Sequence, residues 1–215
     1  MKCINCKLAK NTLLFGALTL ILTVLSYNYL DIKIVNLVHT SDFFGAGIST
    51  FADFFSKCFS PKIWTVVTIL VTIICVYKLF KKKPFDNLCT MSLALILTFF
   101  IAGTMKVLLA RSRPELLIFD NQYGFHFFSF KSAFNSMPSG HTAFSFAGLL
   151  AIANFFKKSY ITALAVFIAC IIAVSRIVIL DHFVSDVIIA AYIGIFCYLW
   201  AKSFVENKFN ETKPN

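Results

Sequence analysis

Charged residues are scarce in this sequence of 215 residues: Asp, Glu, Lys and Arg make up only 14% of it, against about a quarter in soluble domains. Apolar residues make up 59%, and 26 of the residues are Phe. This composition excludes a disordered chain. It also argues against a soluble globular domain, because a fold of this size cannot bury so much apolar surface. We therefore expect one membrane-embedded domain covering residues 1–215.

The sequence also has few acidic residues and no second CxxC motif beside its first. Ten Asp and Glu stand against 20 Lys and Arg, which gives a formal net charge of +10. In a membrane protein such an excess is typical of cytoplasmic anchoring loops rather than of a nucleic-acid partner. Cys3 and Cys6 form a single CxxC motif, and a zinc or redox site would need a second pair or a suitable fold around it. We expect neither role for them.

Long apolar runs are abundant, and they predict an all-α bundle of six transmembrane helices, since a spanning helix needs about 20 mostly apolar residues. The first run follows three Lys residues, which would also suit a signal peptide. Because the run is long and no A-x-A-like cleavage site follows it, a retained span is the preferred interpretation. The expected spans are residues 11–30, 62–80, 87–110, 139–156, 159–180 and 183–201.

Lys and Arg residues set the expected orientation, because they concentrate in cytoplasmic loops. With the N-terminus inside, twelve of them face the cytoplasm and eight face outward, and both termini are cytoplasmic. Two long loops then lie outside. Residues 31–61 contain aromatics at helical spacing, which fit an interfacial helix or a packed loop. Residues 111–138 contain a Phe-rich stretch, Phe125–Phe130, which fits headgroup contact, a lipid entrance or a plug over the bundle.

Ionisable residues near spans are energetically costly and are usually functional. Lys106 and Arg113 lie at the outer end of the third span, seven residues apart, so on a helix they would share a face. Pro114 is expected to end that helix. The fourth span opens with the sequence PSGH, residues 138–141. Its helix N-terminus would offer N–H groups and a positive dipole to a phosphate, and Gly140 would let the ligand approach the backbone.

A third polar group follows the fifth span. Arg176 lies at its end, and His182 and Asp186 follow four residues apart from each other. On a helix this spacing would put the last two on the same side. The carboxylate of Asp186 would hold one imidazole N–H and leave the other nitrogen of His182 free as a nucleophile.

The expected topology places all three groups at the outer ends of their helices, where they would converge into one pocket. Three cations, a helix N-terminus, two His and one Asp would meet there. Such a set suits a tetrahedral oxyanion, because cations and N–H donors stabilise the charge that develops in phosphoryl transfer.

These residues resemble those of the type 2 phosphatidic acid phosphatase superfamily, which includes membrane lipid phosphatases, vanadium haloperoxidases and bacterial acid phosphatases. The family pattern is K-x6-RP, then PSGH, then SR-x5-H-x3-D. This sequence matches every position of the pattern within a motif core of residues 106–186. The matching residues are Lys106, Arg113 and Pro114, then Pro138, Ser139, Gly140 and His141, then Ser175, Arg176, His182 and Asp186.

The resemblance implies a phosphatase that needs no metal and no cofactor. His182 would attack phosphorus and form a phosphohistidine, and Asp186 would orient it. His141 would protonate the leaving oxygen and then activate the hydrolytic water. The groups that would bind the phosphate oxygens are Lys106, Arg113, Arg176, Ser139 and the N–H of Gly140.

The implied substrate is a phosphorylated lipid at the outer face of a bacterial inner membrane: undecaprenyl pyrophosphate, lipid A, phosphatidylglycerophosphate or phosphatidic acid. No obligatory protein partner is implied. A lipid-linked phosphotransferase that uses the same phosphohistidine is an alternative that the sequence leaves open. A transporter or structural protein is disfavoured, since its polar residues would lie near the bilayer midplane or along a pore. The six spans also count against a haloperoxidase.

Four nearby ionisable residues are expected to have lesser roles. Arg111 could bind substrate, but it is interpreted as a headgroup anchor. Asp181 is expected to point away from its neighbour His182 and to be non-catalytic, with a role in tuning the site or in pairing with a Lys. His39 and His126 are interpreted as polar residues with satisfied hydrogen bonds.

Overall fold

The computed structural model describes residues 5–81 and 86–211 and is helical throughout them, apart from connecting loops and one isolated β-bridge. Cys3, half of the CxxC motif, lies outside the described residues. The α-helices are α1 (Cys6–Tyr29), α2 (Asp31–Thr40), α3 (Ala46–Cys58), α4 (Pro61–Phe80), α5 (Asp86–Leu109), α6 (Pro114–Asp120), α7 (Gly140–Phe156), α8 (Ser159–Val178) and α9 (Val184–Glu211). Two short 3-10 turns, η1 (Asp42–Phe44) and η2 (Ser132–Phe134), lie in the two long connections.

Five helical stretches in the described part of the chain are long and apolar enough to cross a membrane. They are Cys6–Tyr29, Gly47–Phe80, Asp86–Leu109, Ser159–Val178 and Val184–Lys208. The sixth expected span, residues 139–156, is α7, which has 17 residues and falls short of the about 20 that a typical span needs. The all-α prediction is confirmed, and five of the six spans are supported by length and composition.

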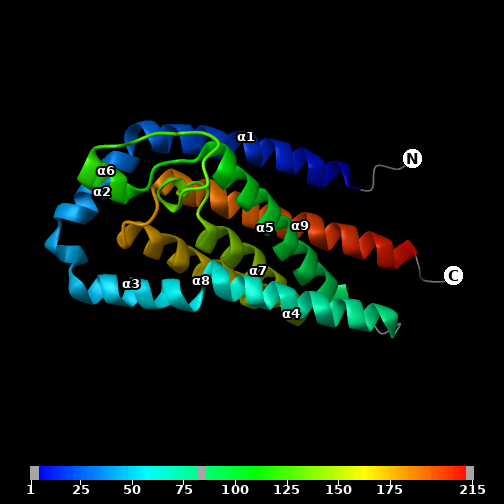
Figure 1. Ribbon diagram of the computed structural model, residues 1–215. Helices are drawn as coiled ribbons and strands as arrows, with labels where there is room; N and C mark the ends of the chain where they lie inside the picture. Colours follow the sequence, from blue (N-terminus) through cyan, green and yellow to red (C-terminus); the bar gives the residue numbers. More distant parts are fainter. Residues whose placement is uncertain (1–4, 82–85, 212–215) are drawn as a thin grey trace.

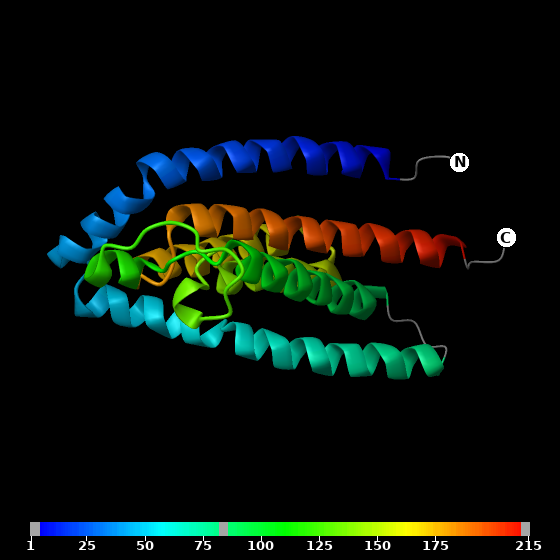
Figure 2. The same ribbon diagram turned by 45° about the horizontal axis from the view of Figure 1, so that its top comes forward.

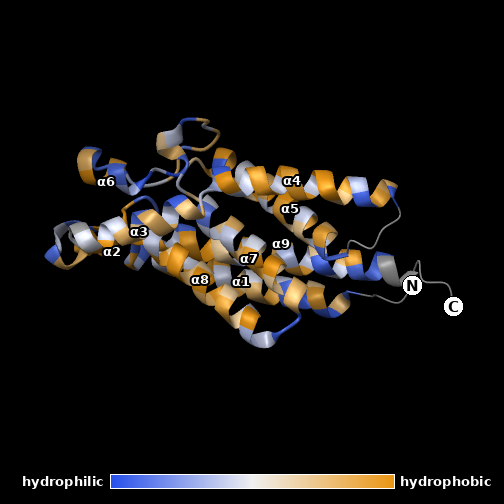
Figure 3. Cartoon of the chain, turned by 90° about the horizontal axis from the view of Figure 1, so that it is seen from below, coloured by the Kyte–Doolittle hydropathy of each residue, from blue (hydrophilic) through white to orange (hydrophobic). Residues whose placement is uncertain are grey.

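The long helices run side by side in a bundle in which α7 and α9 are central (Figures 1 and 2). α1 packs along α9, and α4 packs along α5. The start of α1, the end of α9 and the adjoining ends of α4 and α5 lie at one end of the bundle, and α2, α3 and α6 lie at the other (Figures 1 and 2). Apolar residues dominate the length of the bundle, and hydrophilic residues gather toward its ends (Figure 3).

Small residues let the central helices approach each other closely. Ala143 and Ala147 on α7 and Ala190 on α9 are fully buried. A Cβ atom at Gly194 on α9 would lie only 2.3 Å from the carbonyl oxygen of Ala143, so the two backbones are in contact there. On the other side of α7, a Cβ at Gly148 would lie 2.1 Å from the ring of Trp64. This packing fixes the axis of α7 against α9, and each helix carries one of the polar motifs at its first turn.

The close contact at Gly194 is testable by a matched pair of substitutions. Gly194→Ala should lower the stability of the protein by about 1–3 kcal/mol, because the added methyl group meets backbone that must move. Gly103→Ala should instead be neutral or stabilise by about 0.5–1 kcal/mol, since nothing lies within 4 Å of that position and alanine is the better helix former. Thermal unfolding in detergent, followed by circular dichroism, measures both. Equal stability of the two variants would contradict the packing described here.

Candidate active site

The three polar motifs meet at the end of the bundle that carries α2, α3 and α6. Lys106, near the end of α5, donates a hydrogen bond from Nζ to the carbonyl oxygen of Asn135 at 2.6 Å. The N–H of Ser139 donates to the backbone oxygen of Asp186 at 3.2 Å, which ties the start of α7 to the start of α9. The convergence expected from the sequence is therefore present in the geometry.

His182 and Asp186 form the buried centre of the site. Nδ1 of His182 lies 3.6 Å from Oδ2 of Asp186, just beyond hydrogen-bond distance, and both side chains are almost inaccessible to solvent. The expected helical spacing is only partly present, because α9 begins at Val184 and His182 precedes it in a turn. In that turn the N–H of His182 donates to the backbone oxygen of Arg176 at 3.2 Å. The turn still brings the imidazole to the carboxylate.

The ionisation state of His182 follows from its burial. Loss of solvent around the imidazole lowers the pKa of His182 to about 3, and the opposing effect of Asp186 does not restore it. The ring is therefore neutral at pH 7. Nδ1 faces Asp186, and the other nitrogen, Nε2, lies 3.8 Å from Oδ2 of Asp181.

The carboxylate of Asp186 is held from several directions. Oδ2 accepts hydrogen bonds from the hydroxyl of Ser136 at 2.5 Å and from the N–H of Phe183 at 2.9 Å. Oδ1 accepts from the guanidinium of Arg111 at 2.5 Å. Ser136 belongs to the loop before the PSGH motif, so Asp186 joins that loop to the third motif. A carboxylate held in this way has one orientation, with an edge toward His182.

Two arginines from separate motifs converge on one carboxylate. Arg113 and Arg176 both form ion pairs with Asp181, and Oδ2 of Asp181 lies 3.8 Å from Nε2 of His182. Arg176 also donates to the hydroxyl of Ser56 on α3. The expectation that Asp181 would point away from His182 was wrong. The turn after α8 directs its side chain back toward Arg176, and the two guanidinium groups attract it.

The position of Arg113 also differs from the expected one. α5 ends at Leu109, because Ala110 adopts a positive φ of 43° and the chain leaves the helix there. Arg113 is extended, with φ −82° and ψ 160°, and it caps α6, whose first residue is Pro114. Pro114 thus begins a helix rather than ending one. Lys106 and Arg113 do not share a helix face; the loop brings them to the same site.

The PSGH segment opens α7 as the sequence indicated. α7 begins at Gly140 with Ser139 as its N-cap residue, and Ser139 is fully buried. The hydroxyl of Thr142 donates to that of Ser139 at 3.1 Å. A Cβ at Gly140 would lie 3.8 Å from Cε of Lys106, so the helix N-terminus adjoins the lysine. His141 is half-buried and interacts electrostatically with Arg176 and with His182.

Arg111 is not a headgroup anchor: its side chain is completely buried. Its guanidinium is paired with Asp186 at 2.5 Å and with Asp31, the first residue of α2, at 2.7 Å. It also donates to the hydroxyls of Ser185 at 2.6 Å and of Tyr123 at 3.0 Å. Four aromatic rings surround the guanidinium, with centroids 4.3 to 5.6 Å from Cζ: Tyr27, Tyr123, Phe125 and Phe183.

Sequence reasoning misassigned Arg111 and did not single out its partner Asp31. The signal was their position, since each is an ionisable residue next to a span, where unpaired charge is costly. The pair also explains part of the Phe-rich segment, because Phe125 packs against the guanidinium. Phe127, Phe128 and Phe130 remain exposed. His126, as expected, has a hydrogen-bond partner: its Nε2 lies 2.8 Å from the hydroxyl of Ser112.

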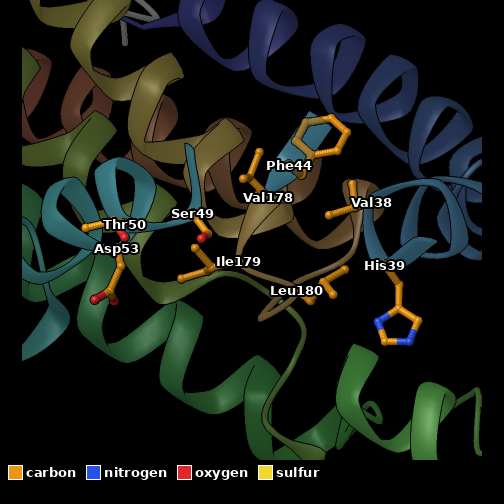
Figure 4. A pocket seen from close by; sticks show the side chains of 9 residues that line it. All are labelled: Val38, His39, Phe44, Ser49, Thr50, Asp53, Val178, Ile179 and Leu180. Carbon is orange, nitrogen blue, oxygen red and sulfur yellow. The ribbon is translucent and has the colours of Figure 1, made fainter. Parts of the chain in front are cut away.

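A cavity of about 550 Å³ opens beside the site. Its lining comes from α2, η1, α3 and the end of α8, and includes exposed His39 (Figure 4). The lining reaches Leu180, the residue before Asp181, and includes Asp53, which interacts electrostatically with Arg176. The segment 31–61 therefore contributes to the surroundings of the site, and its aromatic stretch forms α3, a helix being one of the two alternatives that the sequence left open.

A family model described as the PAP2 superfamily matches residues 87–210, more than half of the chain. The chain belongs to the PAP2 superfamily. The match covers all the motif residues and begins after α4, so Asp31 and Ser56 lie outside it. Among proteins with curated descriptions, no sequence matches this PAP2 protein significantly.

Two solved structures share the fold of this PAP2 protein. LpxE of Aquifex aeolicus aligns with a TM-score of 0.58 and 22% identity, over 80% of this chain and 94% of its own. The first transmembrane PAP2-type phosphatidylglycerolphosphate phosphatase from Bacillus subtilis aligns with a TM-score of 0.63 and 18% identity, over 94% of this chain and 98% of its own. The fold similarity thus extends beyond the motif core to the N-terminal helices.

The buried arginine generates a prediction for stability. Arg111→Met should destabilise the protein by about 3–5 kcal/mol, because it leaves the carboxylates of Asp31 and Asp186 buried without a counter-ion. The double variant Arg111→Met/Asp31→Asn should recover part of that loss, because the second substitution removes one of the two unpaired carboxylates. The measurement is a double-mutant cycle, in which the thermal stability of both single variants and of the double variant is compared in detergent. Strictly additive losses would show that Arg111 and Asp31 do not interact.

Proposed function

We propose that this protein is an integral membrane lipid phosphatase that removes phosphate from a lipid phosphate or pyrophosphate through a phosphohistidine. The observation that carries the proposal is the placement of His182, whose Nδ1 faces Asp186 while its Nε2 faces the carboxylate bound by Arg113 and Arg176. Membership of the PAP2 superfamily and the names of the two structural neighbours support the same activity.

The chemistry follows from this placement. Nε2 of His182 attacks phosphorus, the bond from phosphorus to the leaving oxygen breaks, and His141 donates a proton to that oxygen. His141 then takes a proton from water, whose oxygen attacks the phosphohistidine and releases inorganic phosphate and neutral His182. Asp186 stabilises the positive charge on the imidazole while phosphorus is attached.

Three cations take the place that a metal ion has in many phosphoryl-transfer enzymes. Lys106, Arg113 and Arg176 neutralise the phosphate oxygens, with the hydroxyl of Ser139 and the N–H of Gly140 assisting. Lys106 interacts electrostatically with both arginines, as expected if all three act on one ligand. We therefore propose a metal-independent reaction.

The substrate is proposed to be an amphiphile whose phosphate lies at the membrane surface. The site lies at one end of a bundle whose length is apolar, so a lipid in the bilayer brings its headgroup, and not its chains, to His182 (Figure 3). We favour undecaprenyl pyrophosphate or lipid A, with the site facing the exterior of a bacterial inner membrane and both termini cytoplasmic. Phosphatidylglycerophosphate and phosphatidic acid are the other candidates.

Phosphate release from a lipid panel tests the activity. Purified protein in detergent with EDTA should release phosphate from at least one of these four lipids, and His182→Ala should reduce the rate by at least a thousandfold, because the nucleophile is lost. A requirement for added magnesium would contradict the metal-independent chemistry. Phosphate transfer to an acceptor lipid, without release, would assign the protein as a phosphotransferase.

The roles of the two histidines are separable with an activated substrate. With ³²P-labelled p-nitrophenyl phosphate, whose leaving group needs no proton donor, His141→Ala should accumulate labelled protein that is stable to alkali and labile to acid. Hydrolysis of the phosphohistidine slows in this variant because the base that activates water is missing. His182→Ala should take up no label. Equal labelling of both variants would refute His182 as the nucleophile.

A further inference from the structure

His182 lies between two carboxylates that differ in how they are held. Asp186, on the Nδ1 side, is fully buried and accepts hydrogen bonds from Arg111, Ser136 and the N–H of Phe183. Asp181, on the Nε2 side, is 29% exposed, and its ion pairs are with Arg113 and Arg176. One carboxylate is thus built into the core, and the other is bound by the groups assigned to the substrate.

The carboxylate of Asp181 binds the same two guanidinium groups that are assigned to the substrate's phosphate. Its Oδ2 is 3.8 Å from Nε2 of His182, the atom that attacks phosphorus. A phosphate in line with Nε2 has to place its oxygens against the same two guanidinium groups, because arginine binds carboxylates and phosphates through the same planar set of N–H donors. Asp181 and the phosphate therefore cannot both be bound there.

We propose that Asp181 is a resident competitor of the phosphate: it neutralises the arginines while the site is empty, and substrate displaces it. This inference rests on the proposed function. Its consequence is that Asp181 weakens the binding of substrate and of inorganic phosphate alike. Return of the carboxylate to the arginines assists the departure of the product, which three cations would otherwise hold tightly.

The surroundings of Asp181 permit this exchange. It lies in the turn between α8 and α9, where the backbone is anchored by its own N–H, which donates to the carbonyl oxygen of Arg176 at 3.1 Å. The side chain itself is partly exposed, and the preceding residue, Leu180, lines the cavity of about 550 Å³. In the proposed exchange, the side chain would rotate away from both arginines while the backbone stays in place.

The test measures anion binding rather than turnover. Asp181→Asn and Asp181→Ala each remove the competing charge. Asp53→Asn is the matched control, because Asp53 also acts electrostatically on Arg176 but forms its ion pair with Lys57 on the surface. Binding of inorganic phosphate and of orthovanadate is followed by the rise in unfolding temperature as each is added.

Both Asp181 variants should bind phosphate and vanadate at least about tenfold more tightly than the natural protein. Asp53→Asn should stay within about twofold of it, since the ion pair of Asp53 is with Lys57 and not with the arginines. Without added anion the Asp181 variants should unfold at a lower temperature, because the arginines then repel each other. Unchanged or weaker anion binding in both variants would overturn the proposal and make Asp181 a support for the arginines.

Inorganic phosphate release from the active lipid, measured in parallel, separates this inference from the proposed function. Tighter anion binding by the Asp181 variants, together with a lower Michaelis constant, supports both. Tighter binding in a protein that hydrolyses none of the lipids supports the competitor and counts against the phosphatase. Active enzyme whose anion affinity does not respond to Asp181 leaves the phosphatase standing and removes the competitor.

Discussion

The guanidinium of Arg111, buried between the carboxylates of Asp31 and Asp186, is the interaction on which the site depends. A buried charge without a partner is costly enough to unfold a protein, so each of these three groups requires the others. Through them the start of α2, the loop after α5 and the first turn of α9 are joined at one point. The orientation of the carboxylate beside His182 therefore depends on a residue about 155 positions earlier in the chain, outside the matched family region.

Packing between the helices of the bundle also contributes to the geometry of the site. The contact of α7 with α9 at Gly194 is set by backbone atoms, which cannot rearrange as side chains do. It therefore fixes how far the N-terminus of α7, with Gly140 and His141, stands from the turn that carries His182. His141, the proposed proton donor, lies in the first turn of α7, whereas His182, the proposed nucleophile, lies in the turn before α9. The proposed phosphate-binding cations come from a loop or from the last turns of helices.

The sequence was sufficient to predict an all-helical membrane protein with five of its spans, and it predicted that three polar motifs would converge at one end of the bundle. It failed where the chain leaves regular structure. The spacing of Lys106 and Arg113 was interpreted as a continuous helix. The helix ends earlier because Ala110 adopts a positive φ, and alanine gives no sequence signal for that conformation. Arg111 directly follows the apolar end of a span, a setting shared by headgroup anchors. Only the folded chain shows that Asp31 and Asp186 close around it.

The charges around His182 give separate roles to the buried carboxylate of Asp186 and the partly exposed carboxylate of Asp181. Asp186 is buried, paired with Arg111 and hydrogen-bonded by Ser136 and the N–H of Phe183, an arrangement that would support the cationic phosphohistidine of the proposed reaction. In the proposed reaction, the positive charge of Lys106, Arg113 and Arg176 would also have to be neutralised before the substrate binds and again after the phosphate leaves. Asp181 meets part of it with a single negative charge. A phosphate dianion, which brings two, neutralises one more cation than the carboxylate it replaces. That difference favours the exchange on binding, while the smaller charge of the carboxylate keeps the empty site from holding its occupant too strongly.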